Sequence, residues 1–430
     1  MYAKLKQNLA AFGLALAIVL FAVEMRVPIA GASLPITTNR LGLAMVLLIA
    51  LGTVRSVRVD PLIRCVLVTL WVVVMWAVAS LIVSPYLGMD GGASVVFVIP
   101  WVAAALVCLV AYNIGHALGH DHVRSTLRFL VPLALLTHVF TWSFVLGEVG
   151  VGGLKNPWLV RAAFADFGPG LNRHLNGLFT LSVVSLAMLL GVFKAGVFMV
   201  VEAAAVTLSM LLLAALGGSR QTLVAVVLYC FLLLLITNRR LLGRRGLVVG
   251  CAIPSVAGLF WLFGRRIDLW SWMNARFVRV TQDQYVSGSE RIEILQNGLQ
   301  VIKDNPLLGV GAGAFRMATG SYADNGYLAV AAELGVFPAA ILGLAIVSTI
   351  FVTYRRRRSV HFAARDAHEV LWAFVVVFGI VSATFNEVLA DLALWACIGL
   401  LVFISGREQM VTSAVHENKV RHPPEWSAVP

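Results

Sequence analysis

Residues 9–23 read LAAFGLALAIVLFAV and contain no charged side chain. A bilayer hydrocarbon core of about 30 Å is crossed by a helix of roughly 20 mostly apolar residues, and runs of this kind recur along the whole sequence. We place about twelve of them and expect an all-α integral membrane protein with that number of transmembrane helices. The runs centre near Ala15, Leu47, Val73, Leu106, Leu136, Val184, Ala205, Leu228, Gly258, Leu342, Val376 and Cys397.

The composition agrees with a polytopic membrane protein and excludes a soluble globular domain. Of the 430 residues, 60% are hydrophobic and 13% are charged, and the mean hydropathy is +0.89, whereas soluble domains carry about 25% charged residues. Lys4 and Lys6 precede the first run, but no small-residue cleavage pattern follows it. We therefore expect a retained first helix and not a signal peptide.

Positive charge is distributed unevenly between the connections of the predicted helices. Arginines gather in alternate short connections, such as Arg55 to Arg64 and Arg355 to Arg358. Short loops rich in Lys and Arg favour the cytoplasmic side of a membrane, so we expect both termini in the cytoplasm. The net charge of +12 is then explained by contact with membrane lipids whose headgroups are anionic, and a nucleic-acid partner is not expected.

The chain divides into four parts. Residues 1–263 carry helices one to nine, and residues 264–324 form one large periplasmic loop with short amphipathic helices. Residues 325–405 carry the last three helices, and residues 406–430 form a cytoplasmic tail that we expect to be disordered. The loop is basic, which agrees with its outer position because long loops are exempt from the charge rule.

The large loop is predicted to contain one well-defined helix. Ser287 and Glu290 have the spacing of a capping box at its start, and Pro306 follows its end. We therefore expect Arg291 to lie in the first turn of a helix that packs through one apolar stripe. The stripe consists of Ile292, Leu295, Leu299 and Ile302.

A glycine-rich segment, Gly309 to Gly313, follows that helix. It is not a nucleotide-binding loop, because no strand precedes it and no Lys-Ser or Lys-Thr pair follows it. Two interpretations stay open. The segment is either a close-packed turn or a nest of backbone N–H groups that faces an anion.

Metal ligands are sparse. His116 and His120 are four residues apart and could either ligate zinc or form a cluster at the membrane interface. No matching ligands accompany them, and the five cysteines are not spaced as in metal motifs or disulfide frameworks. We predict no metal and no cofactor.

Polar residues mark the outer ends of two predicted spans. Arg173 and His174 precede one of these spans. Ser219 can cap the next helix, which places Arg220 at the outer end of that span. These side chains could meet a phosphate or a sugar. Alternatively, they are interfacial anchors that extend to lipid headgroups.

A third group of polar residues opens the tenth predicted span. Asp324 and Asn325 are good helix caps, and capping explains either residue alone. Tyr327 follows them, and Glu333 lies about two turns further in, where a buried carboxylate is expensive. We assign Asn325, Tyr327 and Glu333 to glycan binding or to structure.

These features occur in an order that resembles the O-antigen ligase and polymerase superfamily of bacterial glycan-assembly membrane proteins. The resemblance covers roughly residues 211–342. It is carried by the Ser219-Arg220 turn, by the Arg291 helix that ends in Asn-Pro-Leu-Leu-Gly-Val-Gly, and by the Asn-Gly-Tyr-Leu to Glu-Leu-Gly helix. It implies a glycosyltransferase-C-like fold in the bacterial inner membrane with a periplasmic active site.

The resemblance also implies an activity and its substrates. The reaction is glycosyl transfer from an undecaprenyl-diphosphate-linked glycan, and Arg220 and Arg291 correspond to the arginines that bind the donor diphosphate. We add Arg173 to them. The acceptor is a second carrier-linked glycan in a polymerase or lipid A-core in a ligase. A chain-length regulator and a flippase are implied as further partners.

The residue before Asn325 separates the two activities. Ligases of the superfamily typically carry a His there, whereas this chain carries Asp324, so we expect a polymerase of exopolysaccharide or O antigen, with the ligase as the alternative. The attacking hydroxyl needs a base or a strong acceptor within about 3 Å. Asp324 is our first choice for this role and His174 our second. Guanidinium groups neutralise the leaving diphosphate without a metal.

A transporter of lipid-linked sugars is the alternative from another class. Transporters usually have repeated halves and a binding site near the middle of the membrane. This sequence shows no internal repeat, and its polar residues gather at one face. An enzyme that faces outward therefore agrees better with the sequence than a flippase.

Overall fold

The computed structural model describes residues 2–23, 26–27, 36–89, 92–154, 159–160, 163, 171–193, 195–217, 219–237, 285–321, 323, 325–360, 364–382 and 391–421. Side chains are described in these ranges except at residues 2–4, 26–27, 36, 171–174, 217, 220, 285–291, 359, 381–382 and 407–421. The ninth predicted span, near Gly258, lies outside the described residues.

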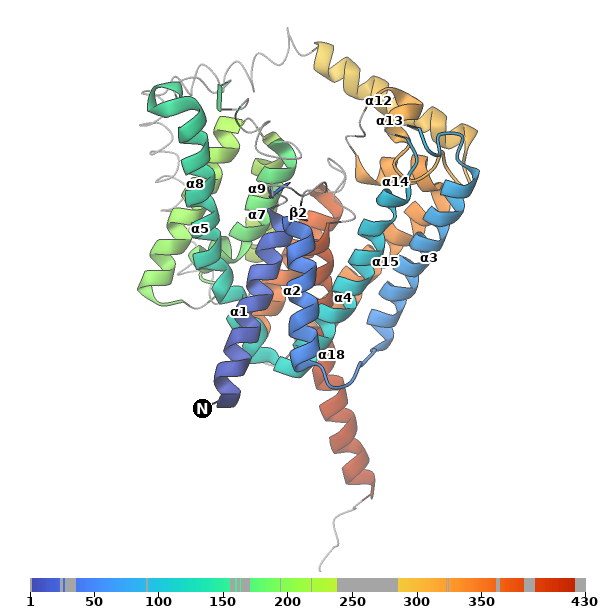
Figure 1. Cartoon of the computed structure of the whole chain (residues 1–430). Helices are drawn as coiled ribbons and strands as arrows, with labels where there is room; N and C mark the ends of the chain where they lie inside the picture. Colours follow the sequence, from blue (N-terminus) through green and yellow to red (C-terminus); the bar gives the residue numbers. More distant parts are fainter. Residues whose placement is uncertain are drawn as a thin grey trace, which may run out of the picture.

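Long helices make up most of the first half of the chain (Figure 1). A short antiparallel pair, β1 (Arg26–Val27) and β2 (Ile36–Thr37), joins the first two helices. The helices are α1 (Tyr2–Ala22), α2 (Thr38–Thr53), α3 (Pro61–Val83), η1 (Val95–Phe97), α4 (Ile99–Leu118), α5 (His120–Gly153), α7 (Leu171–Leu189), α8 (Val197–Gly217) and α9 (Arg220–Ile236).

The second half contains shorter helices as well as long ones. They are α12 (Tyr285–Asp304), α13 (Phe315–Thr319), α14 (Gly326–Leu334), α15 (Val336–Arg356), η4 (Arg357–Ser359), α16 (Arg365–Val376), the π-helix η6 (Val377–Ser382) and α18 (Leu392–Arg421).

Six of the described helices are long and apolar enough to cross a membrane: α1, α3, α4 with η1, α5, α8 and α15. Four shorter apolar helices are α2, α7, α9 and α18. The prediction of a helical membrane protein is therefore confirmed, whereas the number of about twelve spans stays a prediction.

The middle of the bundle is built on close approach of α4 and α18. A Cβ atom at Gly399 of α18 would lie 2.4 Å from the Cys108 carbonyl oxygen, and one at Gly115 of α4 would lie 2.6 Å from the Phe403 ring. Small residues allow helix backbones to approach in a membrane, where apolar side chains gain little by leaving the lipid. These glycines therefore bring the two helices together.

The tenth predicted span is divided into two helices, which corrects our expectation of one continuous helix. α14 ends at Leu334 and α15 begins at Val336, because Gly335 adopts a φ of 97°. The N–H of Val336 donates to the Pro306 carbonyl oxygen at 2.9 Å. Glu333 consequently lies on a separate short helix and not in a membrane-length one.

The C-terminal helix extends beyond the last predicted span. α18 is described as far as Arg421, and the disorder that we expect in residues 406–430 stays a prediction. Residues 406–421 contain no proline and only one glycine, and Pro423 is the first residue that cannot continue a helix. Residues 422–430 lie outside the described part.

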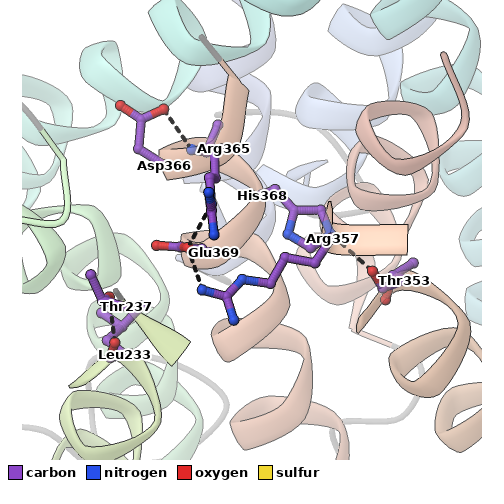
Figure 2. A network of polar contacts seen from close by, with 9 residues as sticks. Leu233, Thr237, Thr353, Arg357, Arg365, Asp366, His368 and Glu369 are labelled. Carbon is purple, nitrogen blue, oxygen red and sulfur yellow. Dashed lines mark hydrogen bonds and ion pairs between the residues drawn. The ribbon is translucent and has the colours of Figure 1, made fainter. Parts of the chain in front are cut away.

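A network of charged side chains joins three helices at one end of the bundle (Figure 2). Glu369 of α16 accepts a hydrogen bond from Arg357 at 2.9 Å and lies 3.4 Å from Arg365. Asp366 forms an ion pair of 2.6 Å with Arg124 of α5. Because a buried charge without its partner costs several kcal/mol, these pairs hold α5, η4 and α16 together.

Candidate functional site

A group of three helices lies beside α3 and the start of α15, away from that network (Figure 1). It consists of α12, α13, α14 and the glycine turn at residues 305–314, and we call it the platform. Phe315, Ala323, Leu328, Ala329 and Ala332 form its small apolar core. The platform contains Arg291, Tyr327 and Glu333, and Asn325 caps its helix α14.

The glycine turn is bound to the last turn of α14. The N–H of Val310 donates to the Ala332 carbonyl oxygen at 2.9 Å, and the N–H of Gly311 donates to the Glu333 carbonyl oxygen at 3.0 Å. The N–H of Phe315 donates to Oε1 of Glu333 at 3.3 Å. Since these backbone donors are used inside the protein, the segment is a close-packed turn.

The same turn requires glycine at positions where a side chain would collide with its surroundings. Gly311 has a φ of 109°, and a Cβ atom there would lie 2.4 Å from Ser84 Oγ. Gly313 has a φ of 84°, and its Cβ atom would lie 2.1 Å from the Phe97 ring. Left-handed backbone and close approach together explain the repeated glycines.

The platform is fixed to α3 by side chains that the sequence analysis missed. Ser80 donates to the Glu333 carbonyl oxygen at 2.7 Å, and Ser84 donates to the Val310 carbonyl oxygen. Trp76 Nε1 donates to the Leu307 carbonyl oxygen at 2.9 Å. The signal in the sequence was present: Trp76, Ser80 and Ser84 recur every four residues on one face of an apolar helix.

α12 packs on the platform through a different face than we predicted. A Cβ atom at Gly298 would lie 2.9 Å from the Leu328 side chain, and Ile294 and Val301 pack on the apolar core. The predicted stripe is mostly exposed, with Ile302 alone packed on that core. The exposed members are Ile292 at 57%, Leu295 at 45% and Leu299 at 52%.

The start of α12 is also corrected. The helix begins at Tyr285, so Ser287 lies inside it and cannot be its N-cap, and Arg291 lies in its second turn. The predicted end is confirmed at Asp304, where Asn305 and Pro306 follow.

Asn325 and Tyr327 hold α14 in place. Asn325 is the N-cap residue of α14, and its Oδ1 accepts hydrogen bonds from Tyr327 N–H at 2.9 Å and Leu328 N–H at 3.0 Å. The Tyr327 hydroxyl donates to the Gly379 carbonyl oxygen of η6 at 2.8 Å. Burial raises the pKa of Tyr327 to about 12, so this hydroxyl keeps its proton and its hydrogen bond.

The predicted site residues on α7 and α9 occupy the first turns of these helices. Arg173 and His174 lie in the first turn of α7, and Arg220 is the first residue of α9. Ser219 is the N-cap of α9 and accepts from the Thr222 N–H at 3.4 Å, as expected. The backbone is described at these positions, whereas the directions of the arginine and histidine side chains are not.

Three contacts place these helix starts at the platform end. Lys6, near the start of α1, and His116, near the end of α4, line one cavity at the end of the bundle away from the platform. α1 and α4 therefore run in opposite directions. The end of α1 therefore lies on the platform side, and Gly177 of α7 is packed against the Ala22 carbonyl oxygen there. Through Gly379 the platform reaches η6, which contacts α9.

The predicted site residues are thus brought to one end of the bundle at the level of the backbone. Asp324 lies outside the described residues, directly before the N-cap of α14. Convergence of the Arg220 and Arg291 guanidinium groups stays a prediction.

The two histidines considered as zinc ligands lie at the other end. His116 and His120 both contact the ring of Phe403, with centroid distances of 4.8 and 5.2 Å. In the described part of the chain, no group of three or more His, Cys, Asp or Glu side chains could hold a metal ion.

The comparison with known families gives a match to the segment that contains the platform. Residues 203–343 match the family described as O-antigen ligase. This segment is similar to the O-antigen ligase family. The match confirms the resemblance to the O-antigen ligase and polymerase superfamily. No curated protein sequence matches the chain.

The matched segment runs from α8 into α15 and includes all three elements that carried the resemblance. Arg220, Arg291, Asp324, Asn325 and Glu333 lie within it. Arg173 and His174 lie before its first residue. The family supports glycosyl transfer of the ligase or polymerase type, with a lipid-linked glycan and an acceptor as substrates.

Proposed function

We propose that the protein is a periplasmic glycosyltransferase that extends exopolysaccharide or O-antigen chains from a polyprenyl-diphosphate-linked glycan. The observation that supports this proposal is the match of residues 203–343 to the O-antigen ligase family, in a chain with six described helices that are long and apolar enough to cross a membrane. A lipid-linked donor presents its diphosphate at the surface of the bilayer. We place the starts of α7, α9 and α14 at such a surface.

Arg220 and Arg291 are the proposed ligands of the donor diphosphate. A guanidinium group binds phosphate oxygens in a bidentate manner and keeps its charge at any physiological pH. As the glycosyl bond breaks, negative charge develops on the leaving diphosphate, and two nearby cations stabilise it without a metal. Arg173 is proposed as an additional contact from α7.

Asp324 is the proposed acceptor of the attacking hydroxyl's hydrogen bond, with His174 as the second candidate. Asn325 Oδ1 caps α14, so that cap does not require Asp324, and we assign the Asp324 carboxylate to the chemistry. A carboxylate can orient the hydroxyl and take its proton as the new glycosidic bond forms.

The proposal is tested with the purified full-length protein and a defined undecaprenyl-diphosphate-linked repeat, in the presence and absence of lipid A-core. A polymerase makes longer chains on the carrier in both reactions. Products are separated by size, and the lipid to which each glycan is attached is identified by mass spectrometry. Unchanged donor in both reactions would contradict glycosyl transfer.

A ligase is the second candidate, because the matching family is described as O-antigen ligase. Its acceptor would be lipid A-core and not a second carrier-linked repeat. The same experiment separates the two activities, since a ligase moves glycan to lipid A-core and leaves the chain length on the carrier unchanged.

A further inference from the structure

A basic cavity lies at the end of the bundle opposite the platform. Its volume is about 380 Å³, and its walls come from the start of α1, the end of α2, the α2–α3 connection and the end of α4. Nothing in the proposed transfer reaction uses this end of the protein. The cavity therefore needs an explanation of its own.

The charge of the cavity comes from side chains. Lys6, Arg55 and Arg58 line it, and none of its lining residues is Asp or Glu. The surrounding helix ends are mixed, since α1 begins there while α2 and α4 end there, so their dipoles oppose one another. Three cations with no lining carboxylate favour an anionic ligand.

The nearest acidic side chain is already engaged. Asp60 follows the cavity in sequence, accepts from the Leu62 N–H at 2.7 Å and lies 3.8 Å from Arg356. Among the described residues, the ion pairs at this end join Arg124, Arg356, Arg357 and Arg365 to carboxylates, and none of them includes a cation of the cavity.

The connection that carries the two arginines is fixed before any ligand binds. Asn113 of α4 accepts the Arg58 N–H through Oδ1 at 2.7 Å and donates through Nδ2 to the Leu109 carbonyl oxygen at 2.9 Å. At the other end of the connection, the Val54 N–H donates to the Ala50 carbonyl oxygen at 2.8 Å. A fixed backbone lowers the entropy that binding must overcome.

Exposed apolar side chains adjoin the cavity on the two membrane helices that form it. Leu5 and Leu9 of α1 are 57% and 62% exposed, and Leu48 and Leu51 of α2 are 68% and 83% exposed. Leu5 is next in sequence to the lining residue Lys6, and Leu51 is next to the lining residue Gly52. On each helix, exposed apolar residues therefore lie one residue away in sequence from the lining of the cavity.

We propose that this cavity binds an anionic phospholipid, with its phosphate beside Arg55 and Arg58 and its acyl chains along the exposed leucines of α1 and α2. Arginine binds phosphate through two parallel hydrogen bonds, and Lys6 adds a third positive charge. A soluble phosphate compound would use the same cations but would leave the leucines uncovered. The exposed leucines beside the cationic lining on α1 and α2 favour the lipid.

The test measures lipid retention by the full-length protein purified in detergent with phosphatidylglycerol. In Arg55→Gln/Arg58→Gln, titration followed by native mass spectrometry is expected to show binding weakened by about thirtyfold, because each basic residue near anionic headgroups contributes to affinity. Equal phosphatidylglycerol binding in wild type and this variant would overturn the proposal.

Two matched variants control for charge and folding. Arg64→Gln/Arg358→Gln removes the same two charges at exposed arginines that do not line the cavity and should bind phosphatidylglycerol like the wild type. Arg55→Lys/Arg58→Lys keeps the charge and should retain most of the binding. Loss of binding in the first control to the same degree would show unspecific charge attraction and would also overturn the proposal.

Inorganic phosphate distinguishes the two sources of the anion. If phosphate binds the wild type as tightly as phosphatidylglycerol and is lost in Arg55→Gln/Arg58→Gln, the ligand is a soluble phosphate and the lipid assignment is wrong. Weak phosphate binding together with tight phosphatidylglycerol binding supports the lipid. This outcome does not depend on glycosyl transfer, which takes place at the other end of the protein.

Discussion

Ser80 of α3 donates a hydrogen bond of 2.7 Å to the backbone carbonyl oxygen of Glu333 on α14. The two residues are 253 positions apart in the sequence, and the bond fixes the platform to a helix long enough to cross the membrane. Its acceptor is a backbone atom, and the Glu333 carboxylate separately holds the Phe315 N–H. Glu333 therefore has a structural role at both its backbone and its side chain.

The donor site is tested by removing one guanidinium group at a time. Arg220→Ala and Arg291→Ala are each expected to lower kcat by about 10²- to 10³-fold, the usual cost of a lost donor at a developing negative charge. Lys303→Ala, which removes an exposed cation from the same helix as Arg291, should keep wild-type turnover. Wild-type product from either arginine variant would contradict the site.

The role of Asp324 is tested by Asp324→Asn, which keeps the size of the side chain and removes its charge. We expect loss of turnover with unchanged thermal stability, since Asn325 provides the cap of α14. His174→Gln serves as the comparison for the second candidate base. Normal turnover of Asp324→Asn would contradict the proposed role of Asp324 and leave His174 as the candidate base.

Gly311→Ala is expected to destabilise the platform. Left-handed backbone costs an alanine roughly 1 kcal/mol, and the clash with Ser84 adds about 1–3 kcal/mol. Gly320→Ala is the control, because Gly320 has a φ of 78° but nothing within 4 Å of an added Cβ atom. Thermal unfolding in detergent should show a larger decrease in Tm for Gly311→Ala, and equal decreases would refute the close packing.

Tyr327→Phe removes the hydrogen bond from α14 to the Gly379 carbonyl oxygen. The expected loss of stability is about 1 kcal/mol, accompanied by reduced turnover because α14 carries Asn325 and follows Asp324. Tyr354→Phe, at a tyrosine that is 47% exposed, should change neither. The comparison uses Tm and initial rates measured on the same preparations. An unchanged Tm for Tyr327→Phe would contradict a stabilising role of this hydrogen bond.

Glu369 is expected to be the most sensitive residue of the charged network. Glu369→Ala leaves Arg357, whose side chain is 16% exposed, without its carboxylate, and breaking a buried pair costs about 3–5 kcal/mol. Removing both partners in Glu369→Ala/Arg357→Ala should cost less than the sum of the two single changes. Additive losses of Tm would show that the pair is not coupled.

The positions of the apolar helices could be predicted from the sequence, because a run of apolar residues long enough to cross a membrane is visible in the sequence itself. The break at Gly335 was missed, although Gly335 and Pro338 are the usual signals for a helix end followed by a helix start. The apolar stripe of α12 misled us, because periodicity identifies an apolar face without saying whether protein or lipid covers it.

The attachment of the platform could not be predicted for a different reason. Ser84 and Trp76 bind the carbonyl oxygens of Val310 and Leu307, and every residue has a carbonyl group. The residue type at the acceptor position therefore gives no signal of such a contact. The donors on α3 have a helical spacing, but only the folded chain shows what they face.

The interruption at Gly335 has a mechanical consequence. A bilayer that is thinner or thicker than the hydrophobic length of α15 is accommodated by tilting such helices. Because Gly335 separates α14 from α15 and α14 is bound to α3, a tilt of α15 is not passed to Asn325 along one continuous helix.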